Sequence, residues 1–104
     1  MLPTDLFPNM TADSTSITIP LADLEGLTAS EADPATGDGR EVARILTNTI
    51  VQKYLAIPQG DRPARFVANK ANPQGIGLEQ VRQNYNLGFD VVIDSTGVAM
   101  VAEA

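Results

Sequence analysis

The stretch that decides the fold is residues 81–93, which read VRQNYNLGFDVVI. Apolar side chains stand at alternate positions through most of this stretch. They belong to Val81, Tyr85, Leu87, Phe89, Val91 and Ile93. Successive side chains of a β-strand point to opposite faces of a sheet, so a period of two predicts a long strand with one apolar face. We expect the remaining elements to cover that face, which makes it the core of the domain.

The predicted strand is too long for the domain that contains it. Its thirteen residues span roughly 43 Å at ~3.3 Å per residue. A domain of this size, with a radius of gyration near ~13 Å, is only about 33 Å across. Gly88 is the expected position of a bend, a bulge or a close backbone approach, because glycine inside a strand commonly marks one of these. If the strand does not bend, its projecting end offers unpaired backbone groups to a second chain.

One amphipathic helix is expected to cover this strand. Asp38 is the predicted N-cap, and Glu41 completes a capping box of the Asp-x-x-Glu kind. The helix should end near Ala56, because Ile57 precedes Pro58 and helical geometry is disfavoured before proline. The apolar face repeats every 3.6 residues. It is formed by Val42, Ile45, Leu46, Thr49, Ile50 and Tyr54.

Shorter patterns complete the expected fold. Residues 16–20 and 65–70 alternate as short strands, and three leucines between residues 21 and 27 suggest a helical turn. Residues 94–97 read DSTG, a turn sequence that should join the long strand to residues 98–103 as a hairpin. The sequence therefore predicts an α+β fold. A small antiparallel sheet of about four strands, including a C-terminal β-hairpin, packs against one amphipathic helix.

The N-terminal segment has no apolar period. Residues 1–16 contain two prolines and several polar turn formers, so we expect an extended arm in front of a single α+β domain at residues 17–104. Such an arm is either a frayed terminus, or it is held on a neighbouring subunit by Leu2, Leu6 and Phe7. These three residues and Gly88 are the candidate interface residues.

Composition excludes several classes of function. The 104 residues include no histidine and no cysteine, so the commonest general base and the commonest metal ligands are missing. Thirteen acidic and seven basic residues give a net charge of −6, which disfavours nucleic-acid binding. No apolar run approaches the roughly 20 residues that span a bilayer, and residues 1–10 lack the features of a signal peptide. A cytoplasmic protein is therefore expected, unless it leaves the cell within a larger particle.

No motif for catalysis or cofactor binding stands out. The acidic side chains around the helix start are the natural candidates for a cation site with oxygen ligands. They are Glu25, Glu31, Asp33, Asp38 and Glu41. Their spacing does not fit an EF-hand, and helix capping explains the last two better. We expect no catalytic residue, no metal and no cofactor, and thus a protein that is not an enzyme.

Residues 23–38, which read DLEGLTASEADPATGD, precede one helix and a C-terminal hairpin. This arrangement resembles small virion proteins of tailed bacteriophages, particularly those of cyanobacteria. The resemblance implies a structural role without enzymatic activity, as a capsid cement or decoration subunit or as a tail or neck component. Such a protein is made in the host cytoplasm, contacts itself and other virion proteins, and is a homo-oligomer. The alternative is a small cytoplasmic regulatory module that binds a ligand or partner on the sheet face, where Tyr85, Leu87 and Phe89 would line a pocket.

Overall fold

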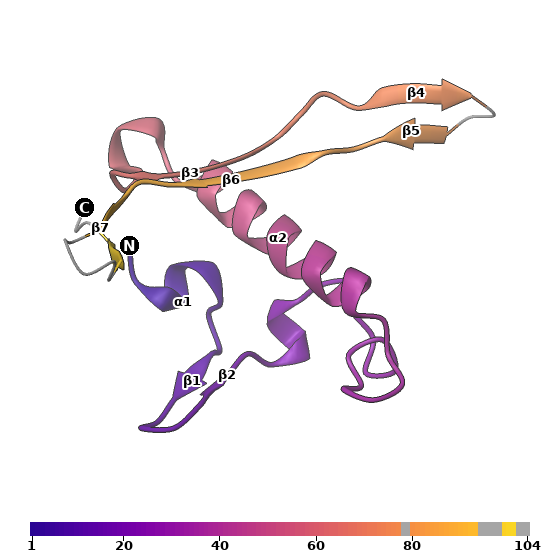
Figure 1. Cartoon of the computed structure of the whole chain (residues 1–104), viewed down its shortest axis with the longest axis horizontal. Helices are drawn as coiled ribbons and strands as arrows, with labels where there is room; N and C mark the ends of the chain where they lie inside the picture. The colour runs from indigo at the N-terminus through magenta and orange to yellow at the C-terminus, as the bar shows by residue number, and fades with distance from the viewer. Residues whose placement is uncertain (78–79, 94–98, 102–104) are drawn as a thin grey trace.

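The computed structural model describes residues 1–77, 80–93 and 99–101 of the chain, and its fold is α+β as expected. One long helix, α2, crosses a two-stranded ribbon, and the N-terminal elements lie on the other side of the helix (Figure 1). The elements, in chain order, are α1 (Pro3–Leu6), β1 (Thr11–Ala12), β2 (Ile17–Thr18), the 3₁₀ turn η1 (Leu21–Asp23), α2 (Gly39–Ala56), the 3₁₀ turn η2 (Gln59–Asp61), β3 (Phe66–Lys70), β4 (Gln74–Gly77), β5 (Gln80–Arg82), β6 (Tyr85–Phe89), β7 (Val91–Ile93) and β8 (Ala99–Val101).

The strands do not form the single sheet of about four strands that the sequence predicts. They pair as four separate antiparallel ribbons of two strands each, β1 with β2, β3 with β6, β4 with β5, and β7 with β8. The expected C-terminal hairpin is confirmed, since Val91–Ile93 pairs with Ala99–Val101. The predicted turn at residues 94–97 lies outside the described residues.

The long strand predicted at residues 81–93 is divided into β5, β6 and β7. One break lies between β5 and β6, where the Asn84 carbonyl accepts the N–H of Ala71 at 2.9 Å and the Gln83 amide donates to the carbonyl of Ala71. The other lies at Asp90, whose N–H donates to the carbonyl of Arg65 at 2.9 Å. Hydrogen bonds across the ribbon therefore continue at both breaks, although the regular strand stops.

Gly88 is not the site of the bend. It pairs with Val67 in the regular register of β3 and β6. A Cβ atom on Gly88 would lie 3.0 Å from Cγ2 of Val67, which is closer than side chains normally pack. Of the roles predicted for this glycine, the structure shows the close approach.

Helix α2 has the predicted bounds. The Asp38 carboxylate caps it by accepting the N–H of Arg40 at 3.0 Å, and the helix ends at Ala56 before Ile57 and Pro58. Glu41 does not close the predicted capping box. Its carboxylate instead receives two hydrogen bonds from the Arg44 guanidinium, at 2.8 and 3.1 Å, because a charged donor one turn away competes well with a backbone N–H.

Two apolar clusters form the core, and α2 contributes to both. The first consists of Phe7, Leu24, Leu27 and Ile45, and the second of Val51, Tyr54 and Ala68. Residues 1–16 are therefore not an extended arm, because they form α1 and β1 and place Phe7, only 8% exposed, in the chain's own core. Burial of one phenylalanine stabilises this arrangement by about 1.5 to 3 kcal/mol, which helps to hold a terminal segment in place.

The apolar face of β6 is only partly covered. The register places Tyr85, Leu87 and Phe89 opposite Lys70, Ala68 and Phe66 of β3, and directly opposed side chains share a face. That face carries Ala68, which is 1% exposed beneath the helix, whereas Phe89 is 65% exposed. The prediction that Phe89 is a core residue is wrong, because the helix packs on Ala68 and Phe66, and the Phe66 ring stacks on Phe89 without burying it.

The molecule is elongated, with extents of 50 × 32 × 30 Å and a radius of gyration of 16.2 Å. A compact chain of this length has a radius of gyration near ~13 Å. The difference agrees with the β4–β5 hairpin, which projects beyond the end of β3 and β6 (Figure 1). Within the described part of the chain, no helix combines the length and the apolar character that crossing a membrane requires.

Candidate protein-interaction site

The structure brings three of the four predicted interface residues together. Leu2, Leu6 and Phe7 line a hollow of about 330 Å³ between α1 and β2. The other lining residues are Met1, Pro3, Met10, Ile17 and Ile19. Leu2 is 67% exposed and Leu6 is half-buried, whereas Phe7 is buried within its own chain. Of the three, only Leu2 remains widely available for a neighbouring subunit. Gly88 lies apart, in the β3–β6 ribbon.

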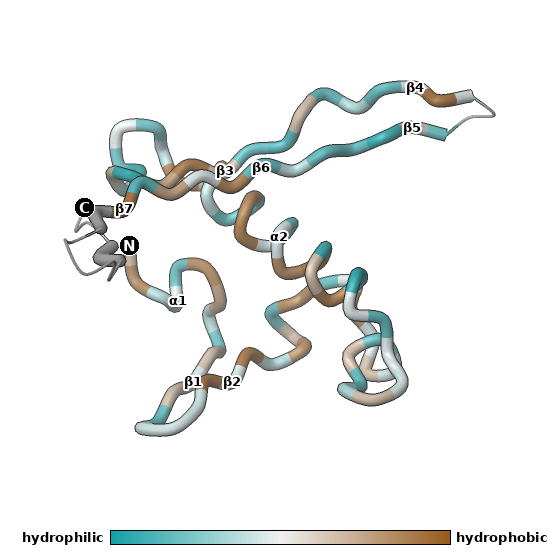
Figure 2. Tube along the Cα trace, viewed as in Figure 1, coloured by the Kyte–Doolittle hydropathy of each residue, from teal (hydrophilic) through white to brown (hydrophobic). Residues whose placement is uncertain are grey.

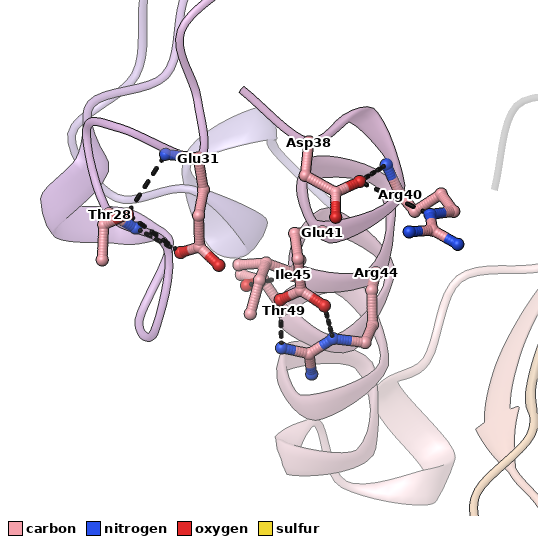
Figure 3. Close-up of polar contacts among 8 residues, drawn as sticks. All are labelled: Thr28, Glu31, Asp38, Arg40, Glu41, Arg44, Ile45 and Thr49. Atoms are coloured by element: carbon pink, nitrogen blue, oxygen red, sulfur yellow. Dashed lines mark hydrogen bonds and ion pairs between the residues drawn. The ribbon is translucent and has the colours of Figure 1, made fainter. Parts of the chain in front are cut away.

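Four of the five acidic residues considered around the start of α2, namely Glu31, Asp33, Asp38 and Glu41, make local hydrogen bonds that shape the backbone or the helix start. Thr28 and Glu31 cap each other, because the Glu31 carboxylate accepts the N–H and hydroxyl of Thr28 at 3.0 Å each and the Glu31 N–H donates to that hydroxyl at 3.2 Å (Figure 3). Gly37 closes the same loop through its N–H, which donates to the carbonyl of Asp33 at 2.9 Å. A Cβ atom at Gly37 would collide with the carbonyl oxygens of Glu31 and Asp33. The loop therefore requires glycine at this position.

Local hydrogen bonds keep these carboxylates ionised. The backbone N–H of Ala35 lowers the pKa of Asp33, and the backbone N–H of Arg40 lowers the pKa of Asp38. The Arg44 side chain lowers the pKa of Glu41. Among the residues that the structure describes, no three acidic side chains come close enough together to hold a metal ion.

The projecting hairpin is exposed along all of β4. We call β4 and β5 (Gln74–Gly77 and Gln80–Arg82) the distal ribbon. Its strands pack mainly on each other, and Ile76 is 52% exposed. The distal ribbon and the adjoining part of β3–β6 are largely hydrophilic (Figure 2). An isolated two-stranded hairpin is marginally stable in water, so this element gains most from further contacts.

Charge is divided unevenly along the chain, a feature that no single motif shows. Residues 1–43 include eight acidic residues and one basic residue, whereas residues 44–90 include six basic and three acidic residues. Most of this positive charge lies outside the ribbon, because residues 66–89 include two basic residues, Lys70 and Arg82, and one acidic residue, Glu79. The described ion pairs join Arg40 to Asp38, Arg44 to Glu41 and Arg65 to Asp90, so none connects the acidic N-terminal half to the ribbon. A running sum of charge along the sequence would have found this division.

A second hollow lies at the end of the β3–β6 ribbon that is farther from β4 and β5. It measures about 640 Å³, and its lining includes the rings of Tyr54, Phe66 and Phe89. Phe66 and Phe89 stack with their ring centres 5.1 Å apart, and the Arg62 guanidinium lies 4.9 Å from the centre of the Tyr54 ring. Of the three residues expected to form a pocket on the strand, only Phe89 lines this one.

The fold and these surfaces define a small α+β protein with an acidic half and a projecting ribbon. Compared with known proteins, the chain matches no protein-family model, no curated protein and no solved structure.

Proposed function

We propose that this protein is a non-enzymatic structural subunit that works by assembling with copies of itself and with other proteins. The observation that carries the proposal is the extent of its exposed surface. The chain exposes 7686 Å², whereas a compact monomer of its mass, 11.0 kDa, exposes about 5,600 Å². The excess of roughly 2,000 Å² exceeds the ~800 Å² that each partner buries in a standard protein interface.

The composition of this surface supports the same proposal. Large apolar side chains are exposed on several elements, among them Leu2 (67%), Ile17 (66%), Ile76 (52%) and Phe89 (65%). Because the strands pair only two by two, each also has one edge without a strand partner within the described residues. Unpaired edges and scattered apolar residues are the surfaces through which β-structures associate.

The setting that we propose for this assembly is a virion. The resemblance of residues 23–38, with the helix and hairpin that follow, to small virion proteins of tailed bacteriophages is its support. A cement, decoration, tail or neck subunit is present in many copies, so it needs an extensive contact surface rather than a catalytic centre.

The aromatic hollow at Tyr54, Phe66 and Phe89 favours a second candidate function. Aromatic walls beside an arginine suit a small ligand or a peptide side chain. In that case the protein is a binding module that acts as a monomer.

The oligomeric state distinguishes the two functions. Sedimentation velocity of the full chain, at concentrations from about 1 to about 100 μM, a range in which assemblies with micromolar affinity form, should show a species larger than 11.0 kDa that grows with concentration. Circular dichroism of the same samples verifies that the chain is folded. A folded chain that stays monomeric throughout contradicts the assembly proposal and favours the binding module.

A further inference from the structure

We infer that two copies of this chain associate through the free edge of β6, in an antiparallel pair centred on Leu87. This inference rests on the proposed function, for which it names the partner and the surface that meets it. The pair joins β3 and β6 of one copy to β6 and β3 of the other, so that two ribbons become one four-stranded sheet.

The hydrogen-bond pattern shows which backbone groups of β6 face away from β3. The N–H of Asp90 donates to the carbonyl of Arg65, and the N–H of Ala71 donates to the carbonyl of Asn84, each at 2.9 Å. Hydrogen-bonded and non-hydrogen-bonded pairs alternate in an antiparallel ladder, so these two bonds and the register fix the pattern between them. The residues of β6 whose N–H and C=O groups point to the open edge are therefore Tyr85, Leu87 and Phe89.

The same residues present apolar side chains beside that edge. Directly opposed side chains share a face, and Leu87 lies opposite Ala68 of β3. Ala68 is 1% exposed, whereas Leu87 is 38% and Phe89 is 65% exposed. Helix α2 packs more extensively on β3 than on β6, and within the described residues β6 has no second strand partner. The edge of β6 therefore combines unpaired backbone groups with uncovered apolar side chains.

Charge favours β6 over β3 as the paired edge. Residues 83–89 carry no charge and lie between Arg82 and Asp90. In an antiparallel pair of two β6 strands, the positive end of each lies beside the negative end of the other, which is favourable. Asp90 is paired with Arg65 across the ribbon but is still 71% exposed, so it is open to a second cation. The same pairing of two β3 strands brings Arg65 of each copy beside Lys70 of the other, which is repulsive.

The other described strands are poorer edges. β4 shifts its register on β5 between Gly75 and Gly77, and such irregularities commonly prevent edge pairing. β5, β7 and β8 have three residues each, and β1 and β2 have two. β6 has five residues, like β3, and none of them is charged. Among the described strands, β6 is therefore the edge best suited to a second strand.

The register centred on Leu87 uses all of the outward-facing groups. In an antiparallel pair, outward-facing residues of the two strands exchange hydrogen bonds with each other. With Leu87 opposite Leu87 of the second copy, Tyr85 of each strand lies opposite Phe89 of the other, which adds two aromatic pairs. Centring the pair on Asn86 or Gly88 leaves one outward-facing residue of β6 without a partner in the other β6. The preferred register also covers Phe89, and its twofold symmetry closes the dimer.

Cysteine cross-linking tests the register. The chain contains no cysteine, so Leu87→Cys introduces a single thiol. Opposed residues of a hydrogen-bonded pair have Cα atoms about 5.5 Å apart, which suits a disulfide. The control Val67→Cys places the thiol on β3, at a side chain that is 54% exposed. With oxidised glutathione, Leu87→Cys should form the covalent dimer at least roughly tenfold faster than the control, because assembly raises the local thiol concentration. Equal rates for the two variants overturn the inference.

Opposite charges at residue 87 test the same contact without a covalent bond. Leu87→Lys places two lysines opposite each other and should raise the dissociation constant by roughly tenfold or more, whereas the control Val67→Lys should not. Leu87→Asp should weaken association as well, and an equimolar mixture of the two Leu87 variants should restore it. Sedimentation velocity measures association, and circular dichroism shows whether each variant is folded. A mixture that associates no better than its separate components overturns the inference.

The native chain distinguishes this inference from the proposed function. A native chain that is monomeric removes both. A native chain that assembles, while Leu87→Lys leaves its dissociation constant unchanged, removes only the β6 contact and leaves the proposed function in place.

Discussion

At the scale of single residues, the carboxylates of the N-terminal half shape the backbone. The Asp13 carboxylate accepts the N–H groups of Thr15 and Ser16 at 2.8 and 2.9 Å, and the first of these bonds does most to lower its pKa. Asp33 and Asp38 bind backbone N–H groups two residues ahead in the same manner. Short acidic side chains make such local bonds readily. Their abundance in this chain thus reflects turns and a helix cap, and the charge that remains is available to a partner.

We expect acid to destabilise the protein through these groups. A carboxylate whose pKa is lowered in the folded state stabilises the fold above its unfolded pKa, near ~3.9 for aspartate, and this stability is lost as the pH falls through the folded pKa. The lowered pKa values of Asp13, Asp33 and Asp38 therefore predict a melting temperature that falls between about pH 5 and pH 2.

Asp38→Asn tests one of these groups. Asparagine is itself a good cap but removes the negative charge at the helix start, so the variant should melt lower by roughly 2 to 5 °C at pH 7 and depend less on pH. Asp61→Asn, at a carboxylate without a described side-chain hydrogen bond, is the control and should melt like the native chain. Identical pH profiles for Asp38→Asn and the native chain would contradict the assigned role of the Asp38 charge.

At the scale of elements, α2 is the one piece that touches both apolar clusters. Ile45 faces Phe7, Leu24 and Leu27, whereas Val51 and Tyr54 face the ribbon. The edge-to-face contact between Tyr54 and Phe66, with ring centres 5.3 Å apart, brings the aromatic pair of the ribbon to the end of the helix. The helix covers the ribbon no further than Phe66, so Phe89 is stacked on Phe66 and open to solvent. The stability of the ribbon should therefore depend more on the residues beneath α2 than on Phe89.

Val51→Ala should lower the free energy of unfolding more than Phe89→Ala does, although phenylalanine is the larger side chain. Val51 is fully buried, so its truncation leaves a cavity and should cost about 2 kcal/mol in the free energy of unfolding. Phe89 is 65% exposed, so its truncation loses mainly the stacking contact, about 1 kcal/mol. Urea denaturation of the two variants measures both values. A larger loss for Phe89→Ala would mean that its ring is covered in solution, as it would be within an oligomer.

At the scale of the whole molecule, extension and charge separation occur together. The longest dimension, 50 Å, follows from a ribbon that continues well past the point where α2 crosses it (Figure 1). The acidic residues 1–43 and the projecting ribbon lie in different parts of the structure (Figure 1).

Hydrogen exchange should distinguish the projecting strands β4 and β5 from β3 and β6. In dilute monomer, the amides of β4 and β5 should exchange much faster than those of β3 and β6, because α2 packs on the latter pair and local contacts set local opening. At concentrations that favour the proposed assembly, the amides covered by the contact should exchange more slowly. Equal exchange at low and high concentration, in samples shown to assemble, would mean that the contact covers none of these strands.

Local patterns made much of this fold predictable. The N-cap at Asp38 and the end of α2 before Ile57 depend on neighbours within one or two turns of the chain, so the sequence shows them directly. The segments of β2, β3, β6 and β7 follow from period-two alternation in the same way. Of the interface candidates, Leu2, Leu6 and Phe7 do gather in one place, because proximity along the chain already brings them close.

What the sequence by itself determined is the set of elements: one capped helix, a C-terminal hairpin and alternating strands, each specified by residues a few positions apart. Only the tertiary structure decided which of their faces are covered. Phe7 is buried because the distant α2 packs over it, and Phe89 is exposed because that same helix does not reach it. Covering a face requires contact between residues far apart in the chain, and no periodicity within one segment encodes which partner arrives.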